Sequence, residues 1–292
     1  MKQLLLLYNT RSGRGHIDRC REALVTLFGT YGYRVEPQLL DFSRNPFDGV
    51  AAPPDLVVVA GGDGTVNYVV NCMMQCGLDL ELGILPAGTA NDFARALGMD
   101  KDPLKAARQI ATGEVERIDC GRVNDLCFVN IFSFGLFTTT SQRTPDERKH
   151  QLGKLAYLLE GIKEIRRMHD IPLHIKADGR ELDFHALIAL IFNGETAGGF
   201  HLARRSSVQD GLFDVVLLEK QGFLASCWAM VRYLLGGKPR SVRQLRAATL
   251  EIDSPIAEPT DVDGQCGARF PLSIHCMKGA LRIRCARNVS HD

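Results

Sequence analysis

The chain has 292 residues, about the length of two average domains, and its 45% hydrophobic and 24% charged residues are typical of a globular protein. Lys and Arg number 35 and Asp and Glu 34, so the formal net charge of +1 predicts no nucleic-acid partner. No apolar run reaches the roughly 18 residues of a membrane-spanning helix, and the first residues lack a signal-peptide core. The nine cysteines are scattered without metal-ligand spacing, which indicates reduced thiols in the cytoplasm.

The first 120 or so residues alternate between short apolar runs and segments with helical spacing. Gly29 stands where the C-cap of the first helix is expected. Short loops between repeated β–α units are typical of a doubly wound α/β domain, which we predict over residues 1–121. Strands are expected at 4–8, 34–40, 56–60 and 82–85, and helices at 16–28, 66–74, 91–97 and 103–112.

From residue 122 onward, most apolar runs have the length and turn residues of strands. This pattern predicts a second domain over residues 122–292 that is a largely antiparallel β-sandwich-like structure. The pattern leaves open whether its last residues return to the first domain. Strands are expected at 127–134, 173–177, 184–192, 213–219, 249–253 and 281–285, with helices at 154–168 and 223–235.

A glycine-rich turn, Gly61-Gly62-Asp63-Gly64-Thr65, follows the most apolar strand and leads into a helix. Glycines allow a phosphate to approach the main chain closely, and a helix N-terminus offers N–H groups and a partial positive charge. The turn is neither a Walker A loop nor the dinucleotide-binding fingerprint. It therefore predicts a phosphate cradle of another kind.

A second turn, with Gly88 and Thr89 followed by Asn91 and Asp92, comes after the next strand. Neighbouring parallel strands end at one edge of a sheet, where ligands bind in open α/β folds, so we expect the two turns to lie together. The alternative is that Asn91 and Asp92 cap the following helix, which does not exclude contact with a ligand. A third turn over residues 9–15 adds hydroxyl, glycine and arginine residues.

The sequences Gly-Gly-Asp-Gly-Thr-x-Asn and Leu-Pro-x-Gly-Thr-x-Asn-Asp-Phe-Ala strongly resemble the diacylglycerol kinase catalytic family, specifically its bacterial soluble lipid kinases. Segments 153–157, 198–200, 209–214 and 271–281 extend the resemblance over nearly the whole chain. NAD kinases share the first turn but do not account for these later segments. The resemblance implies an α/β domain like that of NAD kinases, a β-sandwich-like second domain, and ATP in the cleft between them.

The resemblance further implies an ATP- and Mg²⁺-dependent kinase that phosphorylates a hydroxyl of diacylglycerol or a related lipid. It implies that Asp210, with the carbonyls of Ser207 and Leu212, binds Mg²⁺; oxygen ligands suit this ion, although Asp210 is also a good turn residue. The implied nucleotide-binding residues are Asn9, Ser12, Gly13, Gly61, Gly62, Asp63, Gly64, Thr65, Val66, Asn67, Tyr68, Gly88, Thr89 and Asn91.

One departure from the family bears on catalysis. Members usually carry Asp-Gly-Glu late in the chain, with the glutamate as base, whereas this sequence has Asp263-Gly264-Gln265. General-base catalysis is worth roughly 10²–10⁴ in rate, but phosphoryl transfer depends chiefly on positioning. If the segment is extended, Asp261, Asp263 and Gln265 share one face, and Asp263 is a candidate stand-in base. The alternative is a catalytically silent nucleotide- or lipid-binding homologue.

Residues 221–250 contain five basic and no acidic residues and begin with an apolar helix that bears Trp228. This combination suits an anionic bilayer surface, where a lipid substrate resides. The alternative is a helix packed on its own sheet with solvated arginines. We therefore expect a cytoplasmic protein that is peripheral on the inner face of the membrane, and the sequence leaves a homodimer open.

Overall fold

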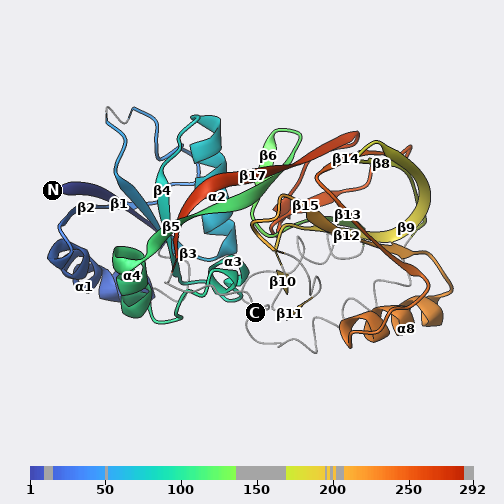
Figure 1. Ribbon diagram of the computed structural model, residues 1–292, viewed down its shortest axis with the longest axis horizontal. Coiled ribbons are helices and arrows are strands. Elements are labelled where there is room, and N and C mark those ends of the chain that lie inside the picture. The colour runs from blue at the N-terminus through green and yellow to red at the C-terminus, as the bar shows by residue number, and fades with distance from the viewer. Residues whose placement is uncertain are drawn as a thin grey trace. The chain divides into compact units, whose positions relative to one another are not determined.

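The structure, a computed structural model, describes residues 1–9, 16–49, 52–135, 169–194, 196–197, 200–201 and 207–285. The chain divides into two compact units (Figure 1). The first comprises Met1–Cys120 together with Lys278–Asp292, and the second comprises Gly121–Met277. Each unit is described by itself below.

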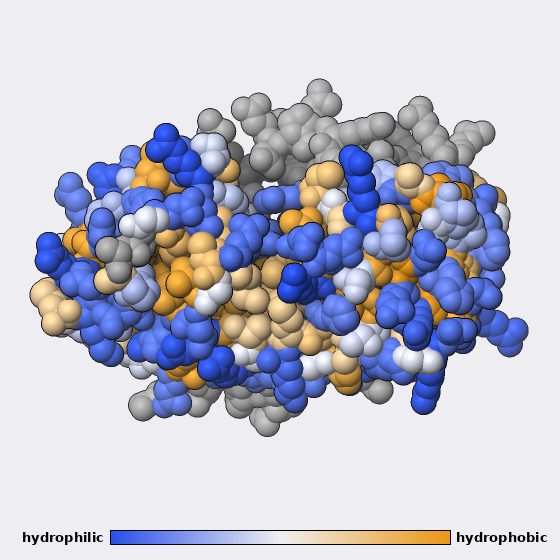
Figure 2. Space-filling model, turned by 90° about the horizontal axis from the view of Figure 1, so that it is seen from above, coloured by the Kyte–Doolittle hydropathy of each residue, from blue (hydrophilic) through white to orange (hydrophobic). Residues whose placement is uncertain are grey.

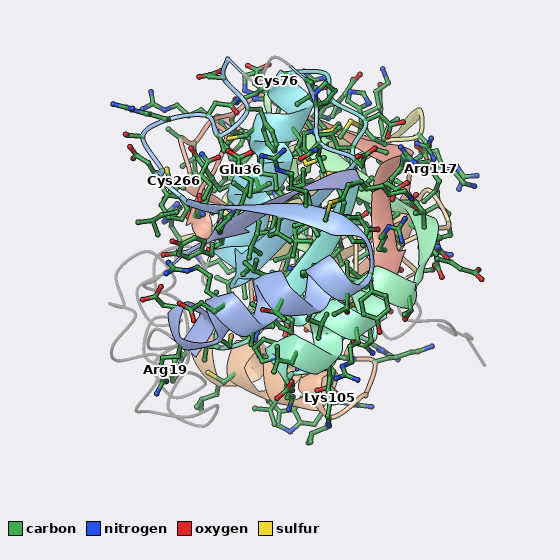
Figure 3. The ribbon with its side chains drawn as sticks, turned by 90° about the vertical axis from the view of Figure 1, so that its left-hand side faces the viewer. Arg19, Glu36, Cys76, Lys105, Arg117 and Cys266 are labelled. Atoms are coloured by element: carbon green, nitrogen blue, oxygen red, sulfur yellow. The ribbon has the colours of Figure 1, made fainter. Side chains whose placement is uncertain are left out.

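The first unit is built on a parallel sheet in the order β4-β3-β1-β2. The connection from β1 to β2 runs toward one edge of the sheet, and the connection from β3 to β4 runs toward the other edge. Because both crossovers are right-handed, the helices of the two connections lie on opposite faces of the sheet. Figure 3 shows α1 and α4 on one face and α2 on the other. The elements are β1 (Lys2–Tyr8), α1 (His16–Thr30), β2 (Tyr33–Leu39), β3 (Leu56–Gly61), α2 (Asp63–Gln75), β4 (Glu81–Pro86), α3 (Asp92–Ala96) and α4 (Pro103–Thr112).

The predicted α/β pattern of this unit is confirmed, with two corrections at helix ends. The helix α1 continues through Gly29 to Thr30, and the left-handed residue that follows it is Gly32, with φ of +85°. The helix α2 begins at Asp63 rather than at residue 66. Its polar first turn lies outside the apolar spacing from which the helix was predicted.

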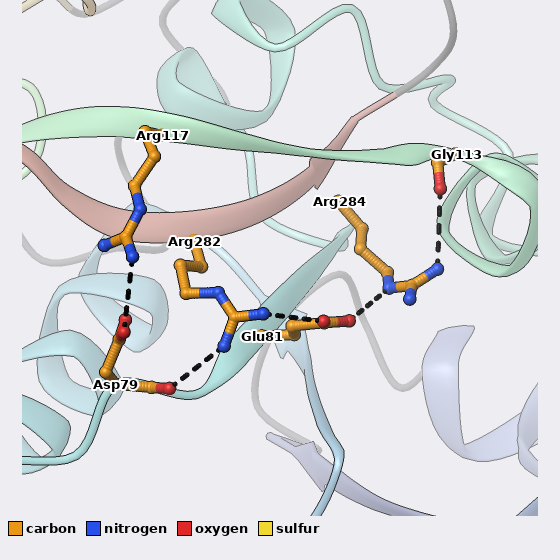
Figure 4. A network of polar contacts seen from close by, with 6 residues as sticks. All are labelled: Asp79, Glu81, Gly113, Arg117, Arg282 and Arg284. Carbon is orange, nitrogen blue, oxygen red and sulfur yellow. Dashed lines mark hydrogen bonds and ion pairs between the residues drawn. The ribbon is translucent and has the colours of Figure 1, made fainter.

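The strand β17 (Leu272–Cys285) begins in the second unit and ends in the first, where it pairs in parallel with β4. Figure 4 shows the charged contacts that hold it there. Glu81 of β4 accepts from Arg282 at 2.9 Å and from Arg284 at 2.7 Å. Arg284 is only 14% exposed, so this pair is partly shielded from solvent. The sequence predicted only the last five residues of this strand.

The second unit is a mainly antiparallel sheet. The apolar cluster at its centre includes Phe128, Phe132, Phe134 and Phe213, all fully buried. Its elements are β6 (Leu126–Phe128), β7 (Ile131–Gly135), β8 (Ile171–Ala177), β9 (Arg180–Phe192), β12 (Phe213–Glu219), α8 (Phe223–Leu234), β13 (Val242–Ala247), β14 (Thr249–Asp253), β15 (Thr260–Val262) and β16 (Gln265–Cys266). The strand β5 (Glu114–Val123) leads into it, and β10 (Thr196–Ala197) and β11 (Phe200–His201) form a separate hairpin.

The predicted β-rich second domain is confirmed, but the strand expected at 127–134 is two strands. The chain leaves the ladder at Asn130, whose carbonyl accepts from the main chain of Asn193 at 2.8 Å. The helix expected at 154–168 lies outside the described residues. None of the helices within the described residues combines the length and hydropathy needed to cross a bilayer. Figure 2 shows a face on which hydrophilic side chains alternate with patches of apolar ones.

Candidate active site

The first candidate site lies at the carboxyl ends of β1 and β3. These strands are neighbours, with Tyr8 paired to Ala60, and their connections run to opposite sides of the sheet. Ligands of open α/β folds bind at such a switch point. Asn9 crosses it: its main-chain N–H donates to Ala60 and its side-chain amide donates to Thr65 Oγ1 at 3.3 Å.

The first glycine-rich turn joins β3 to α2. Gly62 is the N-cap residue, with extended backbone (φ −91°, ψ −178°), and contributes no cap side chain. The positive end of the helix dipole is therefore not covered by a capping side chain at this position. Thr65 and Asn67 are buried, and Val66 packs in the core. This turn can present main-chain N–H groups to an anion.

The second turn lies directly against the first. The main-chain N–H of Ala87 donates to Gly61 O at 2.9 Å. A Cβ atom built on Gly88 would lie 2.4 Å from Gly62 Cα, so the two backbones are in contact only because both residues are glycine. The expectation that the two turns lie together is confirmed.

Asn91 closes the second turn on itself. Its side-chain oxygen accepts from Gly88 N at 2.7 Å, and its side-chain amide donates to Gly88 O at 2.9 Å. The residue is left-handed (φ 48°, ψ 47°) and occupies the N-cap position of α3 without capping it through its side chain. Asn91 is therefore a brace for the turn, rather than the cap that the sequence also allowed.

Asp63 connects the first turn to α3. Its carboxylate accepts from the main-chain N–H of Phe93 at 3.1 Å. Asp92, which precedes Phe93 in the sequence, is buried and forms an ion pair with Arg95. Asp63 therefore holds the two turns in register, which is a positioning role for a residue that the resemblance assigns to nucleotide binding.

Tyr68 lies one turn farther along α2. Its hydroxyl donates to Arg44 O at 2.5 Å, and its ring packs on Phe42 with centroids 4.9 Å apart. Burial, with a smaller contribution from Cys72, raises the pKa of Tyr68 to about 12, so the hydroxyl remains a donor at neutral pH. Tyr68 thus fixes the loop that follows β2. Thr89 is exposed, and Ser12 and Gly13 lie outside the described residues.

The second candidate site is in the second unit, around Asp263. The carboxylate of Asp263 accepts from the main-chain N–H groups of Val129, Asn130 and Ile131 at 2.7, 3.0 and 2.8 Å. Asp263 is 9% exposed. Both carboxylate oxygens of Asp263 therefore already accept main-chain hydrogen bonds, which fix the orientation of the side chain. The structure therefore does not support Asp263 as the stand-in base.

The extended segment considered for residues 261–265 does not form. Val262 pairs with Gln265, so Asp263 and Gly264 are the two turn residues of a tight hairpin between β15 and β16. Both have positive φ, +49° and +87°, as a type I′ turn requires. Gln265 is exposed on β16, beside this turn.

Asp210 shares a guanidinium with a second carboxylate. Arg246 contacts Asp210 Oδ2 and lies 3.4 Å from Asp214 Oδ1, while Leu212 N donates to Asp210 Oδ1 at 2.9 Å. The hydroxyl of Ser207 accepts from a nearby main-chain N–H. Two carboxylates and one guanidinium leave a net charge of −1, and their hard oxygen donors are of the type that Mg²⁺ prefers.

The oxygen donors at Asp210 therefore fit Mg²⁺. In this structure, the positive charge beside Asp210 is the guanidinium of Arg246. Among the described residues, no group of three or more His, Cys, Asp and Glu side chains is placed to hold a metal ion. Any metal at Asp210 would thus need main-chain oxygens or water to complete its shell.

Comparison with known proteins identifies the family. Residues 3–123 match the diacylglycerol kinase catalytic domain, and residues 131–285 match the YegS C-terminal NAD kinase beta sandwich-like domain. A diacylglycerol kinase of Bacillus subtilis is 31% identical over 280 residues, which cover 93% of this chain and 92% of the relative. The chain belongs to the diacylglycerol kinase family. It is a lipid kinase.

A further relative and a solved structure are similar to the lipid kinase over nearly its full length. A diacylglycerol kinase of Staphylococcus saprophyticus is 27% identical over 299 residues, which cover 100% of this chain and 98% of the relative. A crystal structure of a diacylglycerol kinase from Bacillus anthracis has the same fold, with a TM-score of 0.80 and 24% identity over 98% of each chain.

The lipid kinase has two buried amides beside Asp263 that sequence analysis missed. Asn193 donates from its side chain to Val129 O at 3.0 Å, and its main chain donates to Asn130. Asn130 and Asn193 are 5% and 0% exposed. The available signal was an asparagine directly after an apolar run, at the point where a strand ends.

Proposed function

We propose that this lipid kinase transfers the γ-phosphate of ATP to a hydroxyl of diacylglycerol or a closely related lipid. The observation that carries the proposal is the backbone contact between Gly62 and Gly88 at the carboxyl ends of β3 and β4, next to the switch point of the parallel sheet. This arrangement suits the triphosphate of ATP, because helix N-termini and closely approachable main chain favour phosphate. The relatives named diacylglycerol kinase support the choice of lipid.

We assign nucleotide binding to residues 1–121 and the lipid substrate to residues 122–292. In the first unit, the two turns bind the phosphates, with Asp63 and Asn91 keeping them in register. Asn9 and Thr65 border the phosphates at the end of β1. We propose that the other nucleotide-binding residues implied by the family resemblance also contact ATP.

Mg²⁺ would be held at Asp210 with the main-chain oxygens of Ser207 and Leu212. The ion would be structural, and its positive charge would offset the carboxylate of Asp210. Arg246, which contacts both Asp210 and Asp214, keeps the two carboxylates together.

We propose that the enzyme is active despite Gln265. Phosphoryl transfer needs little proton abstraction before the transition state, since positioning and charge stabilisation dominate. Gln265 can orient a lipid hydroxyl without accepting its proton. The alternative is a catalytically silent homologue. Gln265 favours this alternative, because the neighbouring Asp263 already accepts three main-chain hydrogen bonds and does not replace the missing base.

Replacing Gln265 with glutamate should raise kcat on diacylglycerol in mixed micelles at least tenfold. The exposed carboxylate would restore a base at the family position, and a base is worth about 10²–10⁴ in rate. The assay follows transfer of ³²P from ATP to several lipids. Gln265→Asn is the control, because it keeps the amide. Turnover that appears only in Gln265→Glu would establish the silent homologue, and equal rates in both variants would remove Gln265 from catalysis.

Replacing Asp210 with asparagine should abolish the stabilisation of the protein by Mg²⁺. Wild-type protein should melt at a higher temperature in MgCl₂ than in NaCl of equal ionic strength. Saturation to 100 times Kd is worth about 2.7 kcal/mol, which is several degrees for a protein of this size. Differential scanning fluorimetry measures this without activity. Asp125→Asn, at a fully exposed side chain, is the control. A Mg²⁺ shift that survives in Asp210→Asn would place the ion elsewhere.

A further inference from the structure

We propose that α8 is the element by which this enzyme docks on an anionic bilayer. The docking surface consists of Phe223, Leu224, Trp228, Val231 and Leu235, with Arg232 and Lys238 beside it. This inference rests on the proposed function in one respect, since a kinase of a bilayer lipid has to work at the bilayer surface.

The first argument is that α8 has an inner face already filled by its own unit. Ala229 is buried, and Met230 and Tyr233 pack against an apolar cluster of the underlying sheet. That cluster includes Ile188 of β9 and Leu218 of β12. The helix is therefore anchored without its remaining apolar residues, so those residues are not needed to hold it in place.

The second argument is an apolar stripe on the outer face. Leu224, Trp228, Val231 and Leu235 follow one another at spacings of four, three and four residues, which places them on one side of the helix. They are 78%, 60%, 37% and 80% exposed. A contiguous apolar patch of this kind on a surface helix marks an interaction site.

Exposed apolar side chains are concentrated on this stretch of the chain. The described residues expose ten large apolar side chains, and five of them lie between Phe223 and Leu235. Single exposed apolar residues are ordinary on protein surfaces, whereas half of the total on one 13-residue stretch is not.

The third argument is charge, which selects a lipid surface as the occupant. Residues 221–250 have no acidic residue, and Arg232 lies 5.1 Å from the ring centre of Trp228 at the stripe itself. Tryptophan and basic residues beside an apolar face are typical of helices that lie in the interface of anionic membranes.

The other cations of the segment are engaged differently. Arg246 is paired with Asp210 and Asp214. Arg240 and Arg243 line an open pocket of about 510 Å³ together with Asp183 and Glu219, so acidic groups balance them locally. We therefore assign the electrostatic attraction to Arg232 and Lys238, which follow the stripe.

The fluorescence of Trp228 tests the docking directly, because it is the only tryptophan of the chain. Addition of vesicles of phosphatidylcholine with 30% phosphatidylglycerol to the full-length protein should shift its emission to the blue. Lipids brominated on the acyl chain should quench it. Pure phosphatidylcholine vesicles should have a weaker effect. Vesicles that bind the protein in sedimentation but leave Trp228 emission unchanged would overturn the proposal, as would the absence of any vesicle binding.

Variants separate the apolar and charged contributions. Leu224→Ser with Trp228→Ser should weaken sedimentation with anionic vesicles at least tenfold without lowering Tm, since both side chains are exposed. Arg232→Gln with Lys238→Gln should weaken it by about fivefold for each cation removed. Tyr31→Ser with Leu39→Ser, at exposed apolar positions of the first unit, is the control and should bind like wild type. Equal binding by the helix and control variants would overturn the proposal.

Two further measurements separate this inference from its alternatives. The Leu224→Ser/Trp228→Ser variant should lose turnover on vesicles but keep it on a short-chain diacylglycerol in solution. If wild type phosphorylates neither form, the proposed function fails while the fluorescence result still decides the docking. If light scattering shows a dimer that the same variant dissolves, and vesicles do not bind, the stripe is covered by a second copy and the bilayer proposal is wrong.

Discussion

Replacing Gly88 with alanine should reduce ATP binding at least 100-fold and turnover by a similar factor. The new Cβ would lie 2.4 Å from Gly62 Cα and 2.8 Å from Asn91 Oδ1. Neither contact can be relieved by a flexible side chain, because one is main chain and the other is the brace of the turn. The two turns would have to separate, and a displacement of about 1 Å at a catalytic site costs about 10² in rate.

Calorimetric titration with Mg-ATP measures this effect. Gly29→Ala is the matched control, because a Cβ on Gly29 meets nothing within 4 Å and the residue lies within α1. That variant should bind ATP like wild type and gain up to about 1 kcal/mol in stability from helix propensity. Wild-type ATP affinity in Gly88→Ala would show that the contact between the turns is not the phosphate cradle.

Replacing Asp263 with alanine should destabilise the protein by about 3–9 kcal/mol. Three main-chain N–H groups would lose their acceptor, and each unsatisfied buried donor costs about 1–3 kcal/mol. Total stability of a domain is about 5–15 kcal/mol, so the loss is a large share of it. Chemical denaturation measures the change, and Asp125→Ala, at a fully exposed side chain, should change stability by less than about 0.5 kcal/mol.

Hydrogen exchange distinguishes this structural role from a catalytic one. In Asp263→Asn, the amide protons of Val129, Asn130 and Ile131 should exchange faster, because the charge that favours their hydrogen bonds is gone. A variant that lost kcat while these amides kept their protection would instead restore Asp263 as the proton acceptor.

Local sequence patterns were sufficient for the architecture of the first unit. The strand β3 is an unbroken apolar run, which only a sheet covered on both faces accommodates. The boundaries were harder, because the first turn of α2 is Asp63-Gly64-Thr65 and carries no apolar spacing. Gly279 likewise interrupts the alternation of β17, where it has φ of +61°, so the first part of that strand was missed.

The second candidate site was less accessible from sequence for two reasons. The dipeptide Asp263-Gly264 is typical of a tight hairpin turn, which the prediction of an extended segment did not take into account. By contrast, the pairing of Arg246 with Asp214 depends on the register between β12 and β13. The contact between Asn193 and Val129 joins strand ends that are 64 residues apart. Such contacts between distant segments leave no local pattern to detect.

The crossing strand β17 sets an order on folding during synthesis. The edge of β4 is filled by residues around Arg282, which the ribosome adds some 200 residues after Glu81. Until then, the parallel sheet has an open edge through Leu82, which is fully buried in the finished protein. The first unit can therefore close its sheet only after the intervening unit has been translated. A nascent chain that stalls within the second unit would present this edge to chaperones.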